Sequence, residues 1–314
     1  MGRRLAALAM GGVLALGLVL GAEAILRRRE AVVQLLPHER GRLYGVWPGT
    51  HGTNSHGFHD REWPGAKEKG ERRIVVVGDS MTWGTGTAED AWTRIAEDGL
   101  GEGWRVLNLS TYGYDAAQER ATLRATGTFE ADLVVVAAYQ NDLIPTRTVE
   151  LRGWPIFVGE RGGWFPTARR HSAVVRALEG AVEHRRGSER EDADAFAEAL
   201  RGIANDIAPT QVFAWVIPPH ALAGGNDACI AVAPVGACER AIRRTRQIIG
   251  IAESLKIPHV EVLTMLRKRG AETFFETAED WEHPNADGRR AIGEAFASVI
   301  RASELARPDG DNAP

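Results

Sequence analysis

The sequence lacks several features that mark common classes of protein. Its 314 residues contain no repeat with a period of 20 to 50 residues, which excludes repeat architectures, and no low-complexity tract beyond the short polar end ARPDGDNAP. The 38 lysines and arginines nearly balance the 42 aspartates and glutamates, and the two signs are mixed along the chain. Because no basic stripe is present, we expect no nucleic-acid partner.

Cysteine is also scarce, since Cys229 and Cys238 are the only two. They bracket the stretch IAVAPVGA, whose proline and glycine allow the chain to fold back on itself. A disulfide that closes this loop would fit an oxidising compartment, and two buried free thiols would fit the same residues. We favour a domain on the extracytoplasmic side of the membrane.

One long hydrophobic run is present, from Leu5 to Ala22, and it lies between Arg3 and Arg4 on one side and Arg27 to Arg29 on the other. The run is long enough to span a bilayer. Ala22-Glu23-Ala24 also fits the pattern that precedes a signal-peptide cleavage site, but the run exceeds the usual signal core, so we favour an uncleaved anchor. The arginines alone would favour a cytoplasmic domain, against the argument from cysteine.

The chain divides by composition into four parts. Residues 1–30 form the signal anchor or signal peptide with basic flanks, and residues 31–70 form a polar linker that docks on the domain. The main domain follows at 71–303, and residues 304–314 form a polar tail. Within the domain, residues 143–190 interrupt the pattern with aromatic side chains among Gly, Pro and Arg. This insertion is either a lid or substrate wall, or a loop that its aromatic residues pin to the domain.

From residue 71 onward, apolar strand-like runs alternate with amphipathic helical stretches. RRIVVVG and ADLVVVAAY are examples of the first kind, and AEDAWTRIAEDGL is an example of the second. The predicted strands are 72–78, 104–110, 131–139, 210–219 and 258–263, and the main predicted helices are 88–100, 115–126, 238–255 and 286–302. This alternation predicts an α/β domain whose parallel sheet is covered on both faces, with all strand carboxyl ends along one edge.

Ser80 follows the first of these strands, in the stretch IVVVGDSMTWG. Asp79 and Ser80 are both preferred helix caps, so capping is one interpretation of the pair. A serine nucleophile would need a base, and DWEHPNADG offers His283 three residues after Asp280. The carboxylate can hold one ring nitrogen as a donor, which leaves the other to take the serine proton. The alternative for His283 is an exposed residue at a plain helix start.

Two further residues could stabilise an oxyanion. Gly113 follows the second strand, where its backbone N–H is unencumbered, and Asn141 follows the third, where its side-chain amide can donate. Each is also an ordinary turn residue. The coincidence of all these residues at predicted strand ends or in the final loop nevertheless favours a catalytic site.

In order and spacing, these blocks resemble the SGNH/GDSL hydrolases: GDS at 78–80, Gly113, YQND at 139–142 and DWEHP at 280–284. The stretch NSHGFHDREWP is similar to an element of a bacterial, envelope-associated branch, and the resemblance covers roughly residues 54–302. It implies a three-layer α/β/α sandwich with a flavodoxin-like sheet. It further implies Ser80 as nucleophile, His283 as base and Asp280 as its partner, with an oxyanion hole from Ser80, Gly113 and Asn141.

The chain departs from the family pattern at Tyr139, where glycine is usual. A ring beside the pocket would leave less room, so we expect a short acyl group. The resulting hypothesis is a serine esterase that forms an acyl-enzyme on O-acetyl-type esters of small molecules or glycans, without metal or organic cofactor. The alternatives are an O-acyltransferase that acts on an envelope glycan and a catalytically silent envelope scaffold, although the intact Ser80, Asp280 and His283 argue against the scaffold.

Three other interpretations are weaker. A receiver-like domain would need a lysine across the pocket, and none lies near a predicted strand end. GTGTAED has Glu89 where a dinucleotide fingerprint needs glycine. His51, His56, His59 and Asp60 lack the paired spacing of metal ligands, so we expect no metal there.

Overall fold

The computed structural model describes residues 2–30, 33–34, 42, 44–63, 65–151, 154–158, 171–186, 191–268 and 280–303. They form two compact units: a smaller one of Met1–Trp47 and Thr146–Glu189, and a larger one of Pro48–Pro145 and Arg190–Pro314. The predicted linker at 31–70 is therefore divided between the two units, and most of the predicted insertion at 143–190 belongs to the smaller one. The predicted tail at 304–314 lies outside the described residues.

The larger unit is built on a five-stranded parallel sheet in the order β4-β3-β5-β8-β9. The strands are β3 (Arg72–Gly78), β4 (Trp104–Asn108), β5 (Leu133–Ala137), β8 (Gln211–Val216) and β9 (His259–Glu261). The first strand in the chain lies between the second and third, which is the flavodoxin-like order. This confirms the predicted α/β class and parallel sheet.

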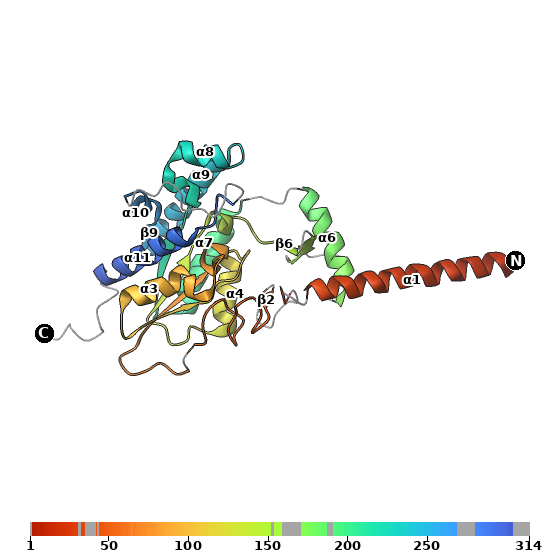
Figure 1. The fold of residues 1–314 in the computed structure, drawn as a ribbon, viewed down its shortest axis with the longest axis horizontal. Coiled ribbons are helices and arrows are strands. Elements are labelled where there is room, and N and C mark those ends of the chain that lie inside the picture. The colour runs from red at the N-terminus through yellow and green to blue at the C-terminus, as the bar shows by residue number, and fades with distance from the viewer. Residues whose placement is uncertain are drawn as a thin grey trace. The chain divides into compact units, whose positions relative to one another are not determined.

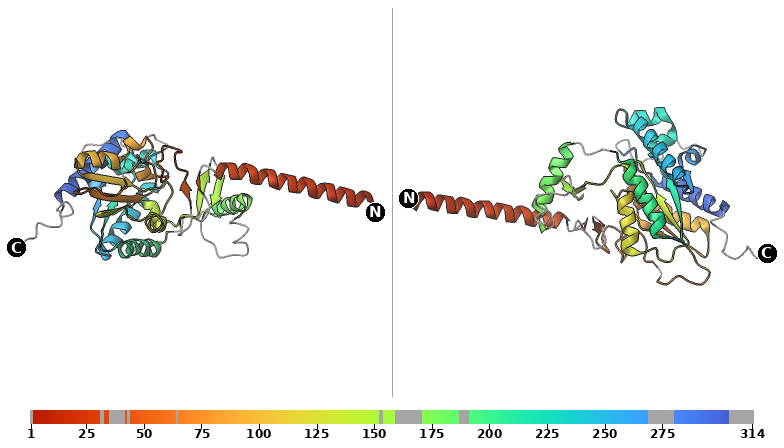
Figure 2. Two further views of the ribbon diagram at one scale, coloured as in Figure 1. Left: turned by 90° about the horizontal axis from the view of Figure 1, so that it is seen from below. Right: turned by 180° about the vertical axis from the view of Figure 1, so that it is seen from behind.

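Helices cover both faces of this sheet (Figures 1 and 2). Side chains of a strand point alternately to the two faces, so Ile74 and Val76 pack in one cluster while Val75 and Val77 pack in the other. The first face is covered by α3 (Trp92–Leu100) and α11 (Ala286–Ala302), and the second by α4 (Ala116–Thr126), α7 (Ala193–Asp206) and the second half of α9 (Ala237–Ser254). The predicted three-layer sandwich is confirmed.

Short helices connect these layers: α2 (Ser80–Trp83), η1 (Ala88–Asp90), η2 (Gln140–Leu143), η3 (His220–Gly224), α8 (Asn226–Val232) and α10 (Leu263–Lys268). Cys229 in α8 and Cys238 in α9 are joined by a disulfide, with an S–S distance of 2.09 Å. Helices α3 and α11 pack closely because Gly293 has no side chain: a Cβ there would lie 2.6 Å from the carbonyl oxygen of Trp92.

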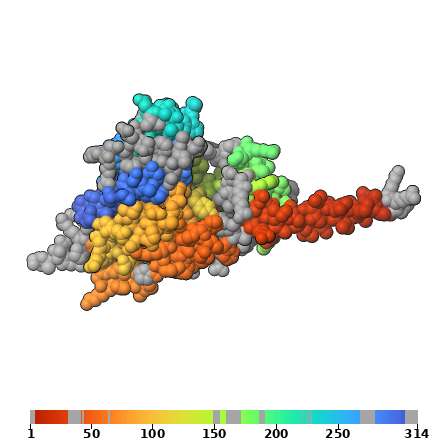
Figure 3. Space-filling model, in the orientation of Figure 1, coloured from red at the N-terminus to blue at the C-terminus, as the bar shows by residue number. Residues whose placement is uncertain are grey.

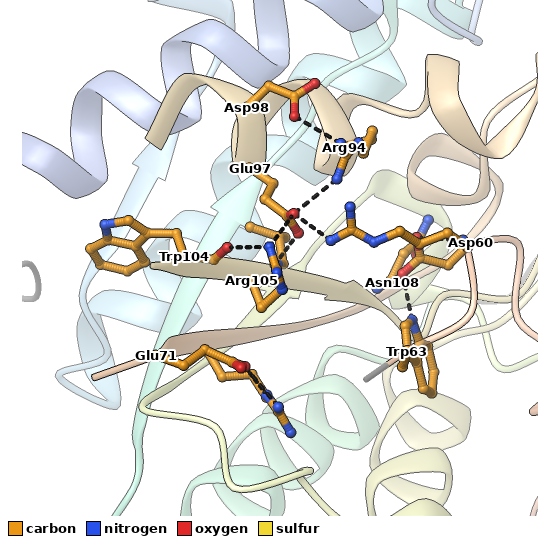
Figure 4. Close-up of polar contacts among 12 residues, drawn as sticks. Asp60, Trp63, Glu71, Arg94, Glu97, Asp98, Trp104, Arg105 and Asn108 are labelled. Atoms are coloured by element: carbon orange, nitrogen blue, oxygen red, sulfur yellow. Dashed lines mark hydrogen bonds and ion pairs between the residues drawn. The ribbon is translucent and has the colours of Figure 1, made fainter. Parts of the chain in front are cut away.

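A buried carboxylate joins α3 to β4 (Figure 4). Glu97 accepts the backbone N–H of Val106 at 2.9 Å and a hydrogen bond from Arg94 at 2.8 Å. It also pairs with Arg105 and with Arg61, so that the segment before the first sheet strand is tied to the same carboxylate. Neighbouring Asp98 pairs with Arg94 from an exposed position.

We expect Glu97→Ala to lower the free energy of unfolding by about 2 to 4 kcal/mol, because it strands the buried Val106 N–H and removes the shared partner of three arginines. Urea unfolding followed by tryptophan fluorescence measures this change. Asp98→Ala is the matched control on the same helix, and its expected change is within about 0.5 kcal/mol. Equal effects of the two changes would contradict the role given to Glu97.

The smaller unit contains helix α1 (Gly2–Glu30), helix α6 (Ala173–Arg186), a hairpin of β6 (Thr148–Leu151) with β7 (Trp154–Phe157), and the two-residue strands β1 (Val33–Gln34) and β2 (Gly45–Val46). Within Leu5–Glu30 of α1, the most apolar 18-residue window has a mean hydropathy of 2.2 and is unburied. By length and composition this helix could cross a membrane or serve as a signal sequence.

Candidate active site

The carboxyl ends of three neighbouring strands meet where the sheet order reverses. The register pairs Gly78 of β3 with Ala137 of β5, and Val76 of β3 with Asn108 of β4. The turns that follow these strands therefore begin side by side. Open parallel sheets bind their ligands at this switch point, outside the strand carboxyl ends.

Ser80 is the first residue of helix α2, immediately after β3. The cap of this helix is Asp79, whose carboxylate accepts the backbone N–H of Met81 at 2.9 Å. The capping interpretation therefore applies to Asp79 and leaves the Ser80 hydroxyl for another partner. That hydroxyl lies 2.8 Å from Nε2 of His283, 203 residues later in the chain.

The other ring nitrogen of His283 faces the side chain of Asp280. Nδ1 lies 2.8 Å and 3.0 Å from the two carboxylate oxygens, and the His283 backbone N–H also donates to this carboxylate at 3.1 Å. The structure thus brings Asp280, His283 and Ser80 together in line. With Nδ1 held as a donor, Nε2 can accept the proton of the serine hydroxyl.

Sequence reasoning missed the residue that holds the His283 loop, which is Arg289 in α11. Its side chain is buried and donates to the carbonyl oxygen of Pro284 at 2.9 Å, to the Thr85 hydroxyl at 2.7 Å and to the carbonyl oxygen of Asp90 at 3.2 Å. It therefore connects the loop that carries His283 with the segment that follows Ser80. A single arginine on a helix belongs to no motif, so no sequence signal marks it.

The two predicted oxyanion donors occupy neighbouring turns. Gly113 has φ = +73°, a left-handed conformation that glycine adopts without strain, in the turn between β4 and α4. Asn141 lies in η2, and its side-chain amide donates to the carbonyl oxygen of Tyr114 at 3.3 Å. Both residues therefore lie at the strand edge where Ser80 begins α2.

Tyr139 is buried in the core cluster, with 4% of its surface exposed. Its hydroxyl donates to Glu282 at 2.6 Å, and the Gln140 amide donates to the same carboxylate oxygen at 2.7 Å. Burial and the charge of Glu282 raise the pKa of the Tyr139 phenol well above its usual value. The expectation that this ring restricts an open pocket is therefore not supported; the ring instead links η2 to the residue before His283.

We expect Tyr139→Phe to lower the free energy of unfolding by about 1 to 2 kcal/mol, because it removes a buried hydrogen bond to a carboxylate. Urea unfolding measures the loss. Combining it with Glu282→Gln closes a double-mutant cycle, in which the two single changes should add to more than the double change. Strict additivity would show that the two side chains are not coupled.

Three carboxyl groups are buried behind Ser80: Asp79, Glu119 and Asp142. Burial raises the pKa of Asp79 to about 6, despite the opposing effects of the Met81 N–H, His283 and Asn141. Burial and neighbouring carboxylates raise the pKa values of Glu119 and Asp142 well above their usual range. Protonated Glu119 and Asp142 would keep negative charge away from a developing oxyanion. The folded state keeps the Asp79 carboxyl protonated up to a higher pH than the unfolded state does. The contribution of this proton to stability therefore falls as the pH rises from about 4 to 6.

His59 and Asp60, which precede the sheet, have structural partners. Nδ1 of His59 lies 2.7 Å from the carbonyl oxygen of Trp83, and Asp60 accepts from the Trp63 indole at 2.7 Å and the Asn108 N–H at 3.0 Å. Burial raises the pKa of Asp60 to about 6. Among the described residues, no group of three or more His, Cys, Asp or Glu side chains is placed to hold a metal ion.

Comparison with known proteins found no matching family model and no matching curated protein. Among solved structures, the chain is similar to an inhibitor-bound aryl esterase from M. smegmatis, with 17% identity, coverage of 74% of this chain and 99% of that chain, and a TM-score of 0.42. It is also similar to a lipase/acylhydrolase from Enterococcus faecalis, with 14% identity, coverage of 73% of this chain and 95% of that chain, and a TM-score of 0.47.

A further similar structure is a putative lipolytic protein of the G-D-S-L family from Desulfitobacterium hafniense DCB-2, with 12% identity, coverage of 73% of this chain and 99% of that chain, and a TM-score of 0.46. At these identities and TM-scores no residue role is transferred, so the roles proposed below rest on the geometry of this chain.

Proposed function

We propose that this protein is a serine ester hydrolase of the SGNH/GDSL type. The observation that carries the proposal is the continuous hydrogen-bonded line from Asp280 through His283 to Ser80, with 2.8 Å at each end of the imidazole. It lies at the carboxyl edge of a parallel sheet, where such folds bind ligands.

In this mechanism the Ser80 oxygen attacks the acyl carbon of the ester while Nε2 of His283 takes its proton. Asp280 holds the imidazole in the required tautomer and stabilises the imidazolium that forms. The backbone N–H groups of Ser80 and Gly113 and the amide of Asn141 stabilise the oxyanion. His283 then protonates the departing alcohol, and a water molecule, deprotonated by the same nitrogen, releases the acid from Ser80.

We further propose that the acyl group is short, such as acetyl, and that the alcohol is a small molecule or a glycan. The side chains hydrogen-bonded beside His283 are polar, namely Gln140 and Glu282. Such surroundings suit a short acyl group and a hydroxylated alcohol better than a long aliphatic chain.

The anchor remains attached in this proposal, and the larger unit faces the extracytoplasmic side. Cleavage after Ala24 would remove Glu23, whose carboxylate accepts the backbone N–H groups of Ala173 and Val174 at the start of α6. The disulfide between Cys229 and Cys238 fits an oxidising compartment.

The experiment that tests this function is hydrolysis of p-nitrophenyl esters of increasing acyl length by the full chain in detergent, beside its Ser80→Ala variant. We expect turnover to be greatest with acetate and to vanish in the variant. Turnover that depends on an added sugar alcohol as acceptor would favour the acyltransferase. Equal background rates in both proteins would favour the scaffold.

We expect Asn141→Ala to lower kcat by about 10²- to 10³-fold with little change in KM, because its amide acts on the oxyanion and not on the bound ester. Steady-state hydrolysis of the preferred ester measures both constants. A thermal unfolding scan serves as the control for folding. An unchanged kcat in a folded variant would exclude Asn141 from the oxyanion hole.

A further inference from the structure

A groove lies within the smaller unit, between the end of α1 and helix α6, with a cavity of about 340 Å³. Its walls are apolar except for one arginine. The lining residues are Ala22, Ile25, Leu26 and Arg29 of α1, Trp154 of β7, and Val174, Ala177, Leu178 and Ala181 of α6. Each helix presents a face with helical spacing, so the groove runs along the line where the two helices meet.

Polar contacts hold the two walls together. Glu23 of α1 accepts the Ser172 hydroxyl at 2.9 Å and the N–H groups of Ala173 and Val174 at 2.9 Å and 3.0 Å. Two turns further along α1, the buried pair of Glu30 and Arg176 joins the helices at 2.9 Å. These contacts fix the two helices that form the walls of the groove.

The apolar side chains at the mouth of the groove are exposed. Leu178 is 64% exposed, Ile25 is 61% exposed and Trp154 is 50% exposed, and Val182 extends the same face of α6. Exposed apolar surface of this kind marks a contact with a partner or a membrane. The exposed surface of α1 is drawn in red in Figure 3, and its apolar run ends at Ala22, which is also the first residue that lines the groove.

Three arginines lie beside the groove, while the two carboxylates there, Glu23 and Glu30, are paired with Arg27 and Arg176. Arg27, Arg28 and Arg29 follow one another at the end of α1, and the guanidinium of Arg29 lies 5.5 Å from the centre of the Trp154 ring. Tryptophan and arginine side chains are typical of the membrane interface, where the ring meets the headgroups and the guanidinium reaches lipid phosphate. The end of a bilayer-spanning α1 would stand at this level.

We propose that this groove binds an acyl chain of an anionic phospholipid, with the headgroup phosphate at Arg28 and Arg29, so that α6 lies against the membrane surface. The lipid fills the apolar cavity and covers Leu178 and Val182, while the phosphate neutralises the arginines. The inference rests on an uncleaved α1, and it is independent of the chemistry at Ser80.

The test uses the full chain in phosphatidylcholine vesicles with about 30% phosphatidylglycerol, in which a small part of either lipid carries a diazirine in its acyl chain. Mass spectrometry maps the labelled peptides after photolysis. We expect label on α6 and on the Trp154 peptide, several-fold more from phosphatidylglycerol. Leu178→Gln should lower the α6 label about five-fold, and Arg29→Gln should remove the preference for phosphatidylglycerol.

Val235→Gln is the matched control, because Val235 is an almost fully exposed apolar residue of the other unit. It should leave the α6 label unchanged. In the unsubstituted chain, α6 label no higher than that of the Val235 peptide would overturn the proposal. An intact mass that matches a chain starting at Ile25 would instead refute the uncleaved anchor on which the inference rests. The ester assay reports separately on Ser80.

Discussion

We expect Ser80→Ala to lower kcat for the preferred ester by about 10⁴- to 10⁶-fold. The change removes the only proposed nucleophile and leaves the binding site and the oxyanion donors in place, so KM should change little. Steady-state hydrolysis, with enough enzyme to exclude traces of contaminating esterase, measures the loss. Pre-steady-state kinetics adds a second measure, because the burst from acyl-enzyme formation should disappear.

Thr82→Val is the matched control for this change. Thr82 lies in the same short helix, is fully buried, and loses only a hydroxyl in a substitution that keeps its volume. Its kcat should stay within about three-fold of the original, since that hydroxyl touches no reacting atom. Should Ser80→Ala retain most of the activity, the acyl-enzyme mechanism would be wrong.

We expect His283→Ala to cost a similar factor of about 10⁴ to 10⁶ in kcat, because Ser80 is then left without the base that takes its proton. Asp280→Asn should cost about 10⁴, since the amide favours the wrong tautomer of the imidazole while the loop keeps its shape. Both losses are measured as kcat at several pH values. Activity of His283→Ala should recover in part with rising pH, as hydroxide replaces the missing base.

The double variant Ser80→Ala/His283→Ala distinguishes a cooperating pair from two independent contributors. If the residues act as one unit, the double change should reduce kcat no further than either single change. Losses that multiply would mean that each residue acts without the other, contrary to the 2.8 Å contact between them.

Much of the larger unit could be predicted from the sequence because its strands are buried on both faces. A run such as residues 74–77, with β-branched or other apolar side chains at every position, has few alternatives to a central parallel strand. Once the strands are placed, a parallel sheet sets their carboxyl ends along one edge, and this is why Ser80, Gly113 and Asn141 could be grouped before their positions were known.

Contacts between distant residues could not be predicted in this way. Periodicity describes one element at a time, and nothing in it joins Tyr139 to Glu282 across 143 residues, or Glu23 to the start of α6 across 150. The same limit applies to the partition of the chain: the sequence predicts an insertion at 143–190 of the α/β domain, yet residues 146–189 group with residues 1–47 in the smaller unit. Tertiary contacts decided both cases.

The interleaved order of the two units affects how a protease could release the larger one. The chain passes between the units three times, near residues 47, 145 and 189. After a single cut before Pro48, residues 48–314 remain one chain that includes α6. Helix α6 would still be bound to α1 through Glu23 and Glu30. With α1 as the proposed anchor, release of the larger unit would require at least two further cuts, or loss of these contacts.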